Sequence, residues 1–304
     1  MRAVVFDPRS PLNIGFGDVP EPEPAADEAV IEVRAIALNL GEIHMISQAD
    51  APGAVPGWDA AGVVTQAAAD GSGPPVGARV VSFAWTGGWA QRRAAAVDDI
   101  GVLPDAVDFA EAAALPVAGA AALQALRALG PVIGERVLVT GASGGVGRFA
   151  VQLAARAGAY VIAAVGNPAR GEGLRELGAD EVLVGLEGIT EPVHGVLDNV
   201  GGPLLAQAFA LVGDGGSAQS IGNASGLPTA IDFDTARLQS VRKRLEPFRA
   251  RPPLRRDLTY LLTLVERGEL DPQIGLRDSW DEIGAVAGAL INRQVAGKAV
   301  LDVA

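Results

Sequence analysis

Residues 136–166 read RVLVTGASGGVGRFAVQLAARAGAYVIAAVG, and this stretch decides the fold that we predict. Residues 136–140 form a short apolar run rich in valine, and residues 141–147 form a glycine-dense turn. Residues 148–157 place apolar side chains three and four positions apart, as an amphipathic helix does, and residues 160–165 return to an apolar strand pattern. The stretch therefore predicts a strand–turn–helix–strand unit, whose helix N-terminus suits the pyrophosphate of a dinucleotide.

The glycines of this turn have defined tasks. A pyrophosphate must approach backbone N–H groups without a Cβ in the way, and the first helical turn must pack closely on the strand. In the pattern A-x-G-x-x-G, from Ala142 to Gly147, Gly144 and Gly147 meet both needs. Because a strand, a helix and a second strand flank the turn, we predict that it binds a cofactor.

The same letters also fit T-G-x-x-x-G-x-G of the short-chain dehydrogenases. That family transfers protons with a Tyr-x-x-x-Lys pair, which is absent here, because Tyr160 is followed at the required position by Ala164 and Tyr260 by Leu264. The short-chain fold also places its glycine turn near the N-terminus, whereas more than a hundred residues precede it in this chain. We therefore set this alternative aside.

Length and composition limit the possible classes. A chain of 304 residues is long enough for two domains, and 49% hydrophobic with 20% charged residues is typical of a globular enzyme. The net charge of −12 argues against nucleic acid or an anionic membrane surface as a partner, since both require clustered Lys and Arg. We expect a small-molecule substrate.

Few residues are available to bind a transition metal. The chain has no cysteine and only two histidines, His44 and His194, so disulfides and thiolate zinc sites are excluded. The chain enters directly as a strand, and no uninterrupted apolar run approaches the roughly 20 residues of a membrane span. We expect a cytoplasmic, metal-free protein.

The N-terminal part is rich in short strands. Pro- and Gly-rich turns separate runs that predict a compact, barrel-like β domain at 2–6, 29–36, 61–65, 76–82 and 89–96. From Asp108 the pattern changes to long Ala and Leu runs, which predict helices with a break at Pro116.

After the glycine turn, strands and helices alternate as in a doubly wound parallel sheet. We predict strands at 160–165, 181–184, 193–200 and 217–222, with the segment to Leu177 and a helix at 203–211 between them. Residues 228–256 stay unassigned, and we interpret their basic cluster as a solvated face. Residues 258–267 predict a helix, and the chain ends as strand, helix, strand.

Together these stretches resemble the medium-chain dehydrogenase/reductase superfamily, in particular its zinc-independent quinone oxidoreductase and enoyl reductase branch. The segments that carry the resemblance are ALN (37–39), PGWDAAGVV (56–64), EAAALPVAGAAALQAL (111–126), VLVTGASGGVGRFAVQLAARAGAYVI (137–162), ELGADEV (176–182), VLDNVGG (196–202) and GKAVL (297–301). The resemblance implies an α/β fold with a GroES-like, β-barrel-type catalytic domain (1–115 and 270–304) and a Rossmann dinucleotide-binding domain (116–269). It also implies that the cofactor binds between them, and that the protein is a homodimer.

The resemblance also bears on zinc. Zinc-containing members carry Gly-His-Glu where this chain has Gly57-Trp58-Asp59, so Trp58 stands in place of the histidine ligand, and the cysteine ligand is missing from 38–43. Without a Lewis acid, dehydrogenating a simple alcohol is difficult. Hydride delivery to an electron-poor quinone or enone does not need one.

By resemblance, Asn39, His44 and Trp58 form the catalytic set. Asn39 would lie near the nicotinamide ribose. His44 occupies a position that is often tyrosine in this branch, where it can hydrogen-bond a substrate carbonyl or donate a proton; a plain place on an exposed helix or loop is the alternative. Trp58 and Trp85 would wall the pocket or simply fill an interface. We expect Asp59 to hold the domain together by hydrogen bonds.

The cofactor preference comes from the end of the second strand. NAD-specific folds place a carboxylate roughly 20 residues past the glycine turn, but residues 166–170 contain no acid. Arg170 would attract a 2′-phosphate, so we predict NADPH, with NADH kept open by Glu172. The cofactor contacts that we expect, several of them by resemblance, are Ser143, Gly144, Gly145, Val146, Gly166, Asn167, Arg170, Asn199, Val200, Ile221, Gly222 and Lys298.

These inferences predict hydride transfer from NADPH to a quinone or an α,β-unsaturated carbonyl compound, with the enolate protonated by solvent or His44. Two alternatives remain open. One is reduction of an enoyl thioester or a biosynthetic intermediate. The other is cofactor binding without turnover, since Ala121 replaces the threonine that the family usually has near the nicotinamide.

Overall fold

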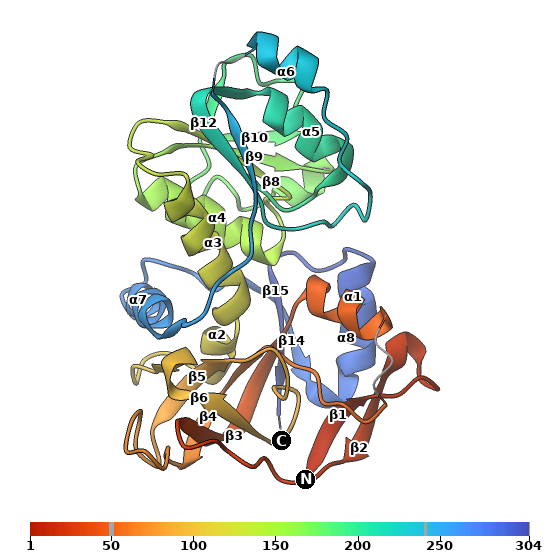
Figure 1. The fold of residues 1–304 in the computed structure, drawn as a ribbon, viewed down its shortest axis with the longest axis vertical. Helices are drawn as coiled ribbons and strands as arrows, with labels where there is room; N and C mark the ends of the chain where they lie inside the picture. Colours follow the sequence, from red (N-terminus) through yellow and green to blue (C-terminus); the bar gives the residue numbers. More distant parts are fainter. Residues whose placement is uncertain (49–51, 240–241, 304) are drawn as a thin grey trace. The chain divides into compact units, whose positions relative to one another are not determined.

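The computed structural model describes residues 1–48, 52–239 and 242–303, and their contacts divide the chain into two compact units. Unit 1 comprises Met1–Ala120 and Arg251–Ala304, and unit 2 comprises Ala121–Ala250. Unit 1 therefore contains both the N-terminal segment, which is red to yellow in Figure 1, and the C-terminal segment, which is blue.

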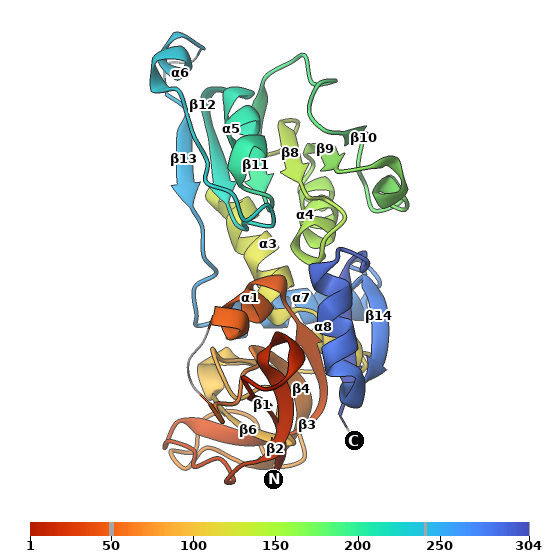
Figure 2. The ribbon, with the colours of Figure 1, turned by 90° about the vertical axis from the view of Figure 1, so that its right-hand side faces the viewer.

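Unit 2 is a parallel sheet of the doubly wound type. Its strand order is β10-β9-β8-β11-β12-β13, which Figure 2 shows from one edge to the other. The strands are β8 (Arg136–Thr140), β9 (Tyr160–Val165), β10 (Glu181–Val184), β11 (Val193–Asp198), β12 (Val212–Ser220) and β13 (Arg244–Pro247). The order reverses between β8 and β11, the place where such sheets bind ligands. The predicted α/β class is confirmed.

Apolar runs explain why β8 and β9 are interior strands of this sheet. Val137, Leu138 and Val139 of β8 are fully buried, as are Val161 and Ile162 of β9. Strands covered on both faces carry such continuous apolar runs rather than an alternating pattern. The helical elements of the chain around this sheet are α3 (Pro116–Ala128), α4 (Gly145–Arg156), η3 (Pro168–Gly171), α5 (Gly202–Ala210) and α6 (Phe233–Gln239).

The connection between β9 and β10 departs from regular alternation. It holds the short 3-10 turn η3 and further turns rather than an α-helix. Gly173 and Gly178 adopt positive φ angles of 76° and 105°, which glycine tolerates and which interrupt a helix. The 3-10 turn itself positions Arg170, as described below.

Unit 1 is built on a mostly antiparallel sheet in the order β14-β15-β3-β4-β5-β7, with β6 also paired to β3. Its strands are β1 (Arg2–Phe6), β2 (Ile14–Asp18), β3 (Glu28–Leu38), β4 (Asp59–Gln66), β5 (Arg79–Phe83), β6 (Arg92–Ala96), β7 (Ile100–Val102), β14 (Ile274–Ser279) and β15 (Lys298–Asp302). The end of the chain joins its beginning here, because Ala299 of β15 pairs with Leu38 of β3.

Helical elements complete unit 1: η1 (Pro11–Asn13), α1 (Leu40–Gln48), η2 (Val97–Asp99), α2 (Phe109–Ala113), α7 (Arg255–Glu266), η4 (Trp280–Glu282) and α8 (Ile283–Ile291). Their core cluster includes the fully buried Trp89 and Trp280. No described helix is long and apolar enough to cross a bilayer.

Residues 251–269, which the sequence analysis assigned to the nucleotide-binding domain, group with unit 1 instead. The cause is α7. The N–H of Leu254 donates to Asp99, Arg255 donates to the carbonyl of Val97, and a Cβ on Gly101 of β7 would lie 2.9 Å from Leu258. Arg255 is exposed, as the solvated-face interpretation predicts, and its guanidinium also links α7 to η2 through the carbonyl of Val97.

Candidate functional site

The glycine turn of unit 2 joins β8 to α4. Gly141 has a φ of 60°, and Gly144 is the N-cap of α4 in an extended conformation without a side chain to cap the helix. The first N–H groups of an α-helix have no acceptor within the helix. Those of Gly145, Val146 and Gly147 are therefore available to an anion, which the positive end of the helix dipole would attract.

Close packing explains Gly147. A Cβ there would lie 2.4 Å from the carbonyl oxygen of Gly141 and 2.7 Å from Cα of Ala142, both of them backbone atoms. A Cβ on Gly144 would meet only the Gly141 oxygen, at 3.4 Å. The structure thus separates the two roles: Gly147 is needed for packing of helix on turn, and Gly144 leaves the surface above the turn open.

A cation lies beside this turn. Nε of Arg170 donates to Oγ of Ser143 over 2.8 Å. The side chain of Asn167 caps η3, with Oδ1 accepting from the N–H of Arg170, and nothing lies within 4 Å of a Cβ built on Gly166. The structure therefore brings together four predicted residues, although Arg170 and Ser143 are 27 positions apart.

A second group lies where β11 ends. Asp198 is fully buried, its Oδ1 accepting from Oγ1 of Thr140 over 2.5 Å and its Oδ2 from the N–H of Gly201 over 2.8 Å. Burial raises the pKa of Asp198 above its ordinary value, and these donors oppose the shift. The side chain of Asn199 donates to the carbonyl of Thr140 over 2.9 Å. These bonds fix the two strand ends relative to each other.

The remaining predicted contacts of unit 2 follow from that arrangement. The N–H groups of Ile221 and Gly222 both donate to the carbonyl of Asp198, and a Cβ on Gly222 would lie 2.8 Å from the carbonyl oxygen of Asn199. Val200 continues the same turn, its carbonyl accepting from the N–H of Ser225. Sequence reasoning missed the Thr140–Asp198 pair. Its signal is the polar residue that ends each of two adjacent apolar strands.

In unit 1, Asn39 and Lys298 belong to a buried network. Nζ of Lys298 donates to Oδ1 of Asn39 over 2.7 Å and to the carbonyl of Leu38 over 3.2 Å, and lies 3.5 Å from Oδ2 of Asp59. Nδ2 of Asn39 donates to that same Asp59 oxygen over 2.9 Å. The expectation that Asp59 holds this domain together by hydrogen bonds fits its second bond, from the N–H of Val117.

The ammonium of Lys298, which was predicted to contact the cofactor, is buried within unit 1. The residue is 2% exposed, and its Nζ lies within 3.5 Å of three oxygens of unit 1. Burial lowers the pKa of Lys298, and Asp59 opposes that shift. A cofactor contact at Lys298 stays a prediction that these bonds do not favour.

Sequence reasoning also missed Glu42, the third residue of α1. Its carboxylate is 2% exposed; Oε1 accepts from the N–H of Trp58 over 2.5 Å, and Oε2 from the N–H of Asn39 over 3.2 Å. Burial raises the pKa of Glu42 to about 8, Asp59 adds to the shift, and the two N–H groups oppose it. Arg93 completes the network by donating to the carbonyl of Trp58 over 3.0 Å.

The aromatic side chains form a short series. The ring of Trp58 meets Trp85 edge to face at 5.4 Å, and Trp85 meets Phe83 in the same way at 4.8 Å. Trp85 is 37% exposed.

His44 lies on α1 and is exposed, on the same helix as Glu42. His194 lies in β11 with Nδ1 3.9 Å from Glu135, far from the strand ends that carry the glycine turn.

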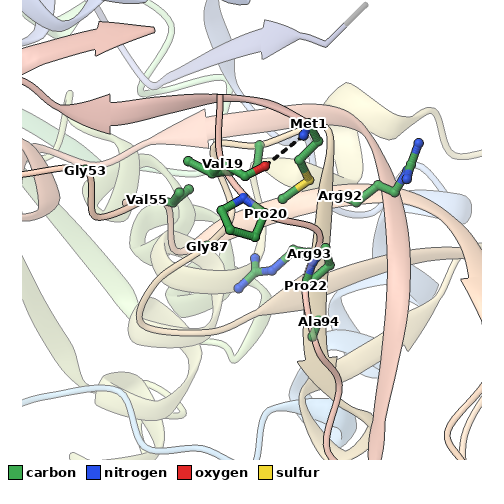
Figure 3. A pocket seen from close by; sticks show the side chains of 11 residues that line it. Met1, Val19, Pro20, Pro22, Gly53, Val55, Gly87, Arg92, Arg93 and Ala94 are labelled. Atoms are coloured by element: carbon green, nitrogen blue, oxygen red, sulfur yellow. Dashed lines mark hydrogen bonds between the residues drawn. The ribbon is translucent and has the colours of Figure 1, made fainter. Parts of the chain in front are cut away.

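Unit 1 also contains a cavity of about 310 Å³, whose walls are shown in Figure 3 and include Arg93 of the buried network. Its lining is mostly apolar, with Val19, Pro20 and Val55 among its members, and Arg92 at its edge pairs with Glu21. None of the predicted site residues lines it. We therefore do not assign the substrate to this cavity.

Metal ligands are scarce in the described ranges. Among residues 1–48, 52–239 and 242–303, no group of three or more His, Cys, Asp or Glu side chains is arranged to hold a metal ion. Two buried acids of unit 1, Glu42 and Asp59, act on two buried cations, Arg93 and Lys298.

Comparisons with known proteins agree with this architecture. Residues 25–123 match the alcohol dehydrogenase GroES-like domain, and residues 145–266 match the zinc-binding dehydrogenase family. The quinone oxidoreductase of Coxiella burnetii superposes with a TM-score of 0.87 at 27% identity, covering 100% of this chain and 99% of that one.

Two curated relatives are more similar in sequence. The trans-enoyl reductase tazE of Aspergillus terreus is 34% identical over 60% of this chain and 67% of its own length. The probable acrylyl-CoA reductase AcuI of Escherichia coli is 32% identical over 71% of this chain and 70% of its own length. The chain spans 54% to 67% of the length of four curated relatives that it matches.

The GroES-like match, the six-stranded parallel sheet and these relatives lead to one conclusion. The chain belongs to the medium-chain dehydrogenase/reductase superfamily.

Proposed function

We propose that this protein is a zinc-independent oxidoreductase that transfers hydride from NADPH to a quinone or to the β-carbon of an α,β-unsaturated carbonyl compound. The observation that carries the proposal is the bond from Arg170 to Ser143 beside the N-terminus of α4. It places a guanidinium next to a turn whose N–H groups suit a diphosphate. A nucleotide with an additional phosphate fits this combination better than one without.

The cofactor would be held mainly by unit 2. N–H groups of Gly145 and Val146 would donate to the diphosphate, and Arg170 would bind the 2′-phosphate through its planar guanidinium. Glu172 follows Arg170 at a distance of two residues, and its carbonyl accepts from Arg148. Its carboxylate is the group that would favour NADH instead.

When bound, NADPH supplies the hydride; the protein's own contribution is orientation and proton supply. Trp58 would provide an apolar wall, and Asn39 would accept a hydrogen bond through the lone pair of Oδ1 that Lys298 does not use. His44 would donate a proton to the oxygen of the substrate carbonyl, or water would do so. Catalysis would then depend mainly on positioning and exclusion of water.

Composition supports chemistry without zinc. The chain has no cysteine, and Trp58 stands where zinc-containing members carry a histidine ligand. A quinone or enone is already electron-poor, so it accepts hydride without a Lewis acid.

The test is NADPH oxidation by the purified protein, with a panel of quinones, enones and enoyl thioesters. We expect saturable turnover with at least one acceptor class. The variant Arg170→Gln should raise the KM for NADPH at least 10-fold and leave that for NADH within about 2-fold. Arg156→Gln, at the other end of α4, is the matched control. Micromolar NADPH binding without reduction of any acceptor would favour a non-catalytic binding protein instead.

A second candidate is reduction of an enoyl thioester, which the similarity to tazE and AcuI favours. Acrylyl-CoA or crotonyl-CoA in the same panel separates the two, since a thioester reductase would show a kcat/KM at least 100-fold above that for simple quinones. The dimer implied by the resemblance is tested by light scattering, where a homodimer has twice the 30.9 kDa of one chain.

A further inference from the structure

The buried network of unit 1 contains a carboxylate to which the proposed chemistry assigns no task. Glu42 contacts two of the three proposed catalytic residues at once, Asn39 through its main-chain N–H and Trp58 through its own. We propose that Glu42 is a positioning residue, whose carboxyl group fixes Asn39 and Trp58 relative to each other. The catalytic roles of Asn39 and Trp58 rest on the proposed function. The way in which Glu42 holds them does not depend on it.

The first argument is connectivity. Glu42 lies in the first turn of α1, and Trp58 comes immediately before β4. The N–H of Ile43 donates to the carbonyl of Asn39, so Asn39 directly precedes that helical turn. One carboxylate therefore ties the start of a helix to the start of a strand, across 16 positions of sequence.

The second argument is that the main chain at Trp58 cannot follow a displaced carboxylate. Gly57 has a φ of 112°, and a Cβ there would lie 2.2 Å from the backbone nitrogen of Trp89. The carbonyl of Trp58 accepts from Arg93, whose side chain is 1% exposed. The N–H of Trp58 thus has a fixed direction, and the 2.5 Å contact requires a side chain of glutamate length.

The third argument is the orientation of the Asn39 amide. Its Oδ1 faces the ammonium of Lys298, and its Nδ2 faces Asp59, with Oε2 of Glu42 3.5 Å away. Turning the amide over would set its NH2 group against a cation and its oxygen against carboxylates. Charge therefore fixes the orientation of the Asn39 amide.

The fourth argument is charge balance. When both acids are ionised, Glu42 and Asp59 carry two negative charges, which balance the two positive charges of Arg93 and Lys298; all four residues are at least 98% buried. Protonating Glu42 leaves the group with a net positive charge and weakens its acceptance of two N–H bonds. Burial raises the pKa of Glu42 to about 8, which brings this change close to neutral pH. Asp59, Arg93 and Lys298 are the charged groups that act on it.

The first test needs no substrate. Protein labelled with 15N-tryptophan gives a backbone amide signal for Trp58, assigned with Trp58→Phe. We expect that signal to move with pH in one transition between about pH 6 and 9, and to stay constant in Glu42→Gln, which keeps the shape but not the charge. Glu32→Gln, an exposed acid paired with Arg34, is the matched control and should retain the transition. A Trp58 signal that titrates equally in Glu42→Gln would overturn the proposal.

The second test uses turnover. Glu42→Gln should lower kcat about 10- to 100-fold with the KM for NADPH within about 2-fold, since only the geometry near the substrate changes. Glu42→Asp retains the charge but is too short, so it should lower kcat while keeping the wild-type pH dependence. If Glu42→Asp has the same kcat as the wild type, the proposal is contradicted. This criterion applies even if Glu42→Gln does not fold. If the wild type itself reduces no acceptor, the proposed function fails, and the amide titration still decides the role of Glu42.

Discussion

The replacement Gly147→Ala tests the packing of the glycine turn most directly. The added Cβ would lie 2.4 Å from the carbonyl oxygen of Gly141 and within 2.8 Å of two atoms of Ala142. All of these are backbone atoms, so no side chain can rotate away. The first turn of α4 must therefore move from β8, or the turn before it must open.

The expected magnitude combines two opposing terms. Alanine is favoured over glycine within a helix by up to about 1 kcal/mol. Insertion of a methyl group into a well-packed place costs about 1–3 kcal/mol, and a backbone contact lies at the upper end. We expect a net loss of about 1–2 kcal/mol in the free energy of unfolding, since the clash exceeds the gain.

Gly288→Ala is the matched control. Gly288 lies inside α8, and nothing comes within 4 Å of a Cβ built there. The same substitution should therefore stabilise the protein by about 0.4–1 kcal/mol. Both variants replace a helical glycine by alanine, so they differ only in the atoms that surround the added methyl group.

Scanning calorimetry measures the result. At about 2–4 °C for each kcal/mol, Gly147→Ala should lower the Tm and Gly288→Ala should raise it. NADPH affinity, measured by calorimetric titration, should fall at least 10-fold in Gly147→Ala alone, because the N–H groups that we propose for the diphosphate would be displaced. A Gly147→Ala protein as stable as the wild type would refute the reasoning.

Three further predictions follow from buried and exposed charges. Thr140→Val removes a donor from buried Asp198 and should cost about 1–3 kcal/mol of unfolding free energy, measured by urea denaturation; an unchanged midpoint would contradict it. Since the pKa of Glu42 is raised from 4.5 to about 8, the folded state holds this proton more tightly than the unfolded chain. Wild-type stability should therefore fall relative to Glu42→Gln as the pH rises from about 5 to 8, and a constant difference between the two urea midpoints would speak against it. Arg277 pairs with Asp302 and Asp108 at a half-exposed site, so Arg277→Met should change stability by less than about 1 kcal/mol, and a Tm shift beyond about 4 °C would show that this pair is undervalued.

Local sequence was sufficient for most strands of unit 2. The runs predicted at 160–165 and 181–184 coincide with β9 and β10, and the glycine turn follows β8 as predicted. The strand predicted at 217–222 begins earlier, at Val212, and α6 and β13 lie within 228–256, which the sequence left unassigned. The connection to β10 could not be read in the same way. Glycine spacing alone does not distinguish a helix from a series of turns.

The catalytic unit depends more on distant parts of the chain. Asp108 begins α2 with a reciprocal capping box to Glu111, a signal visible in sequence. In contrast, α7 joins unit 1 through Asp99 and Val97, about 155 positions away. No local pattern reports such a contact, so the boundary near residue 251 came only from the structure.

For the site, the sequence by itself determined the chemical types: a glycine turn, a nearby arginine without a competing acid, and a tryptophan where a zinc ligand would stand. The tertiary structure alone decided that Arg170 touches Ser143 and that Glu42, Asn39, Asp59 and Lys298 share one buried charge network. The physical reason is that burial and charge pairing depend on which residues the folded chain brings together, including residues that are far apart in sequence. Lys298 reaches Asn39 across 259 positions, because β15 pairs with β3.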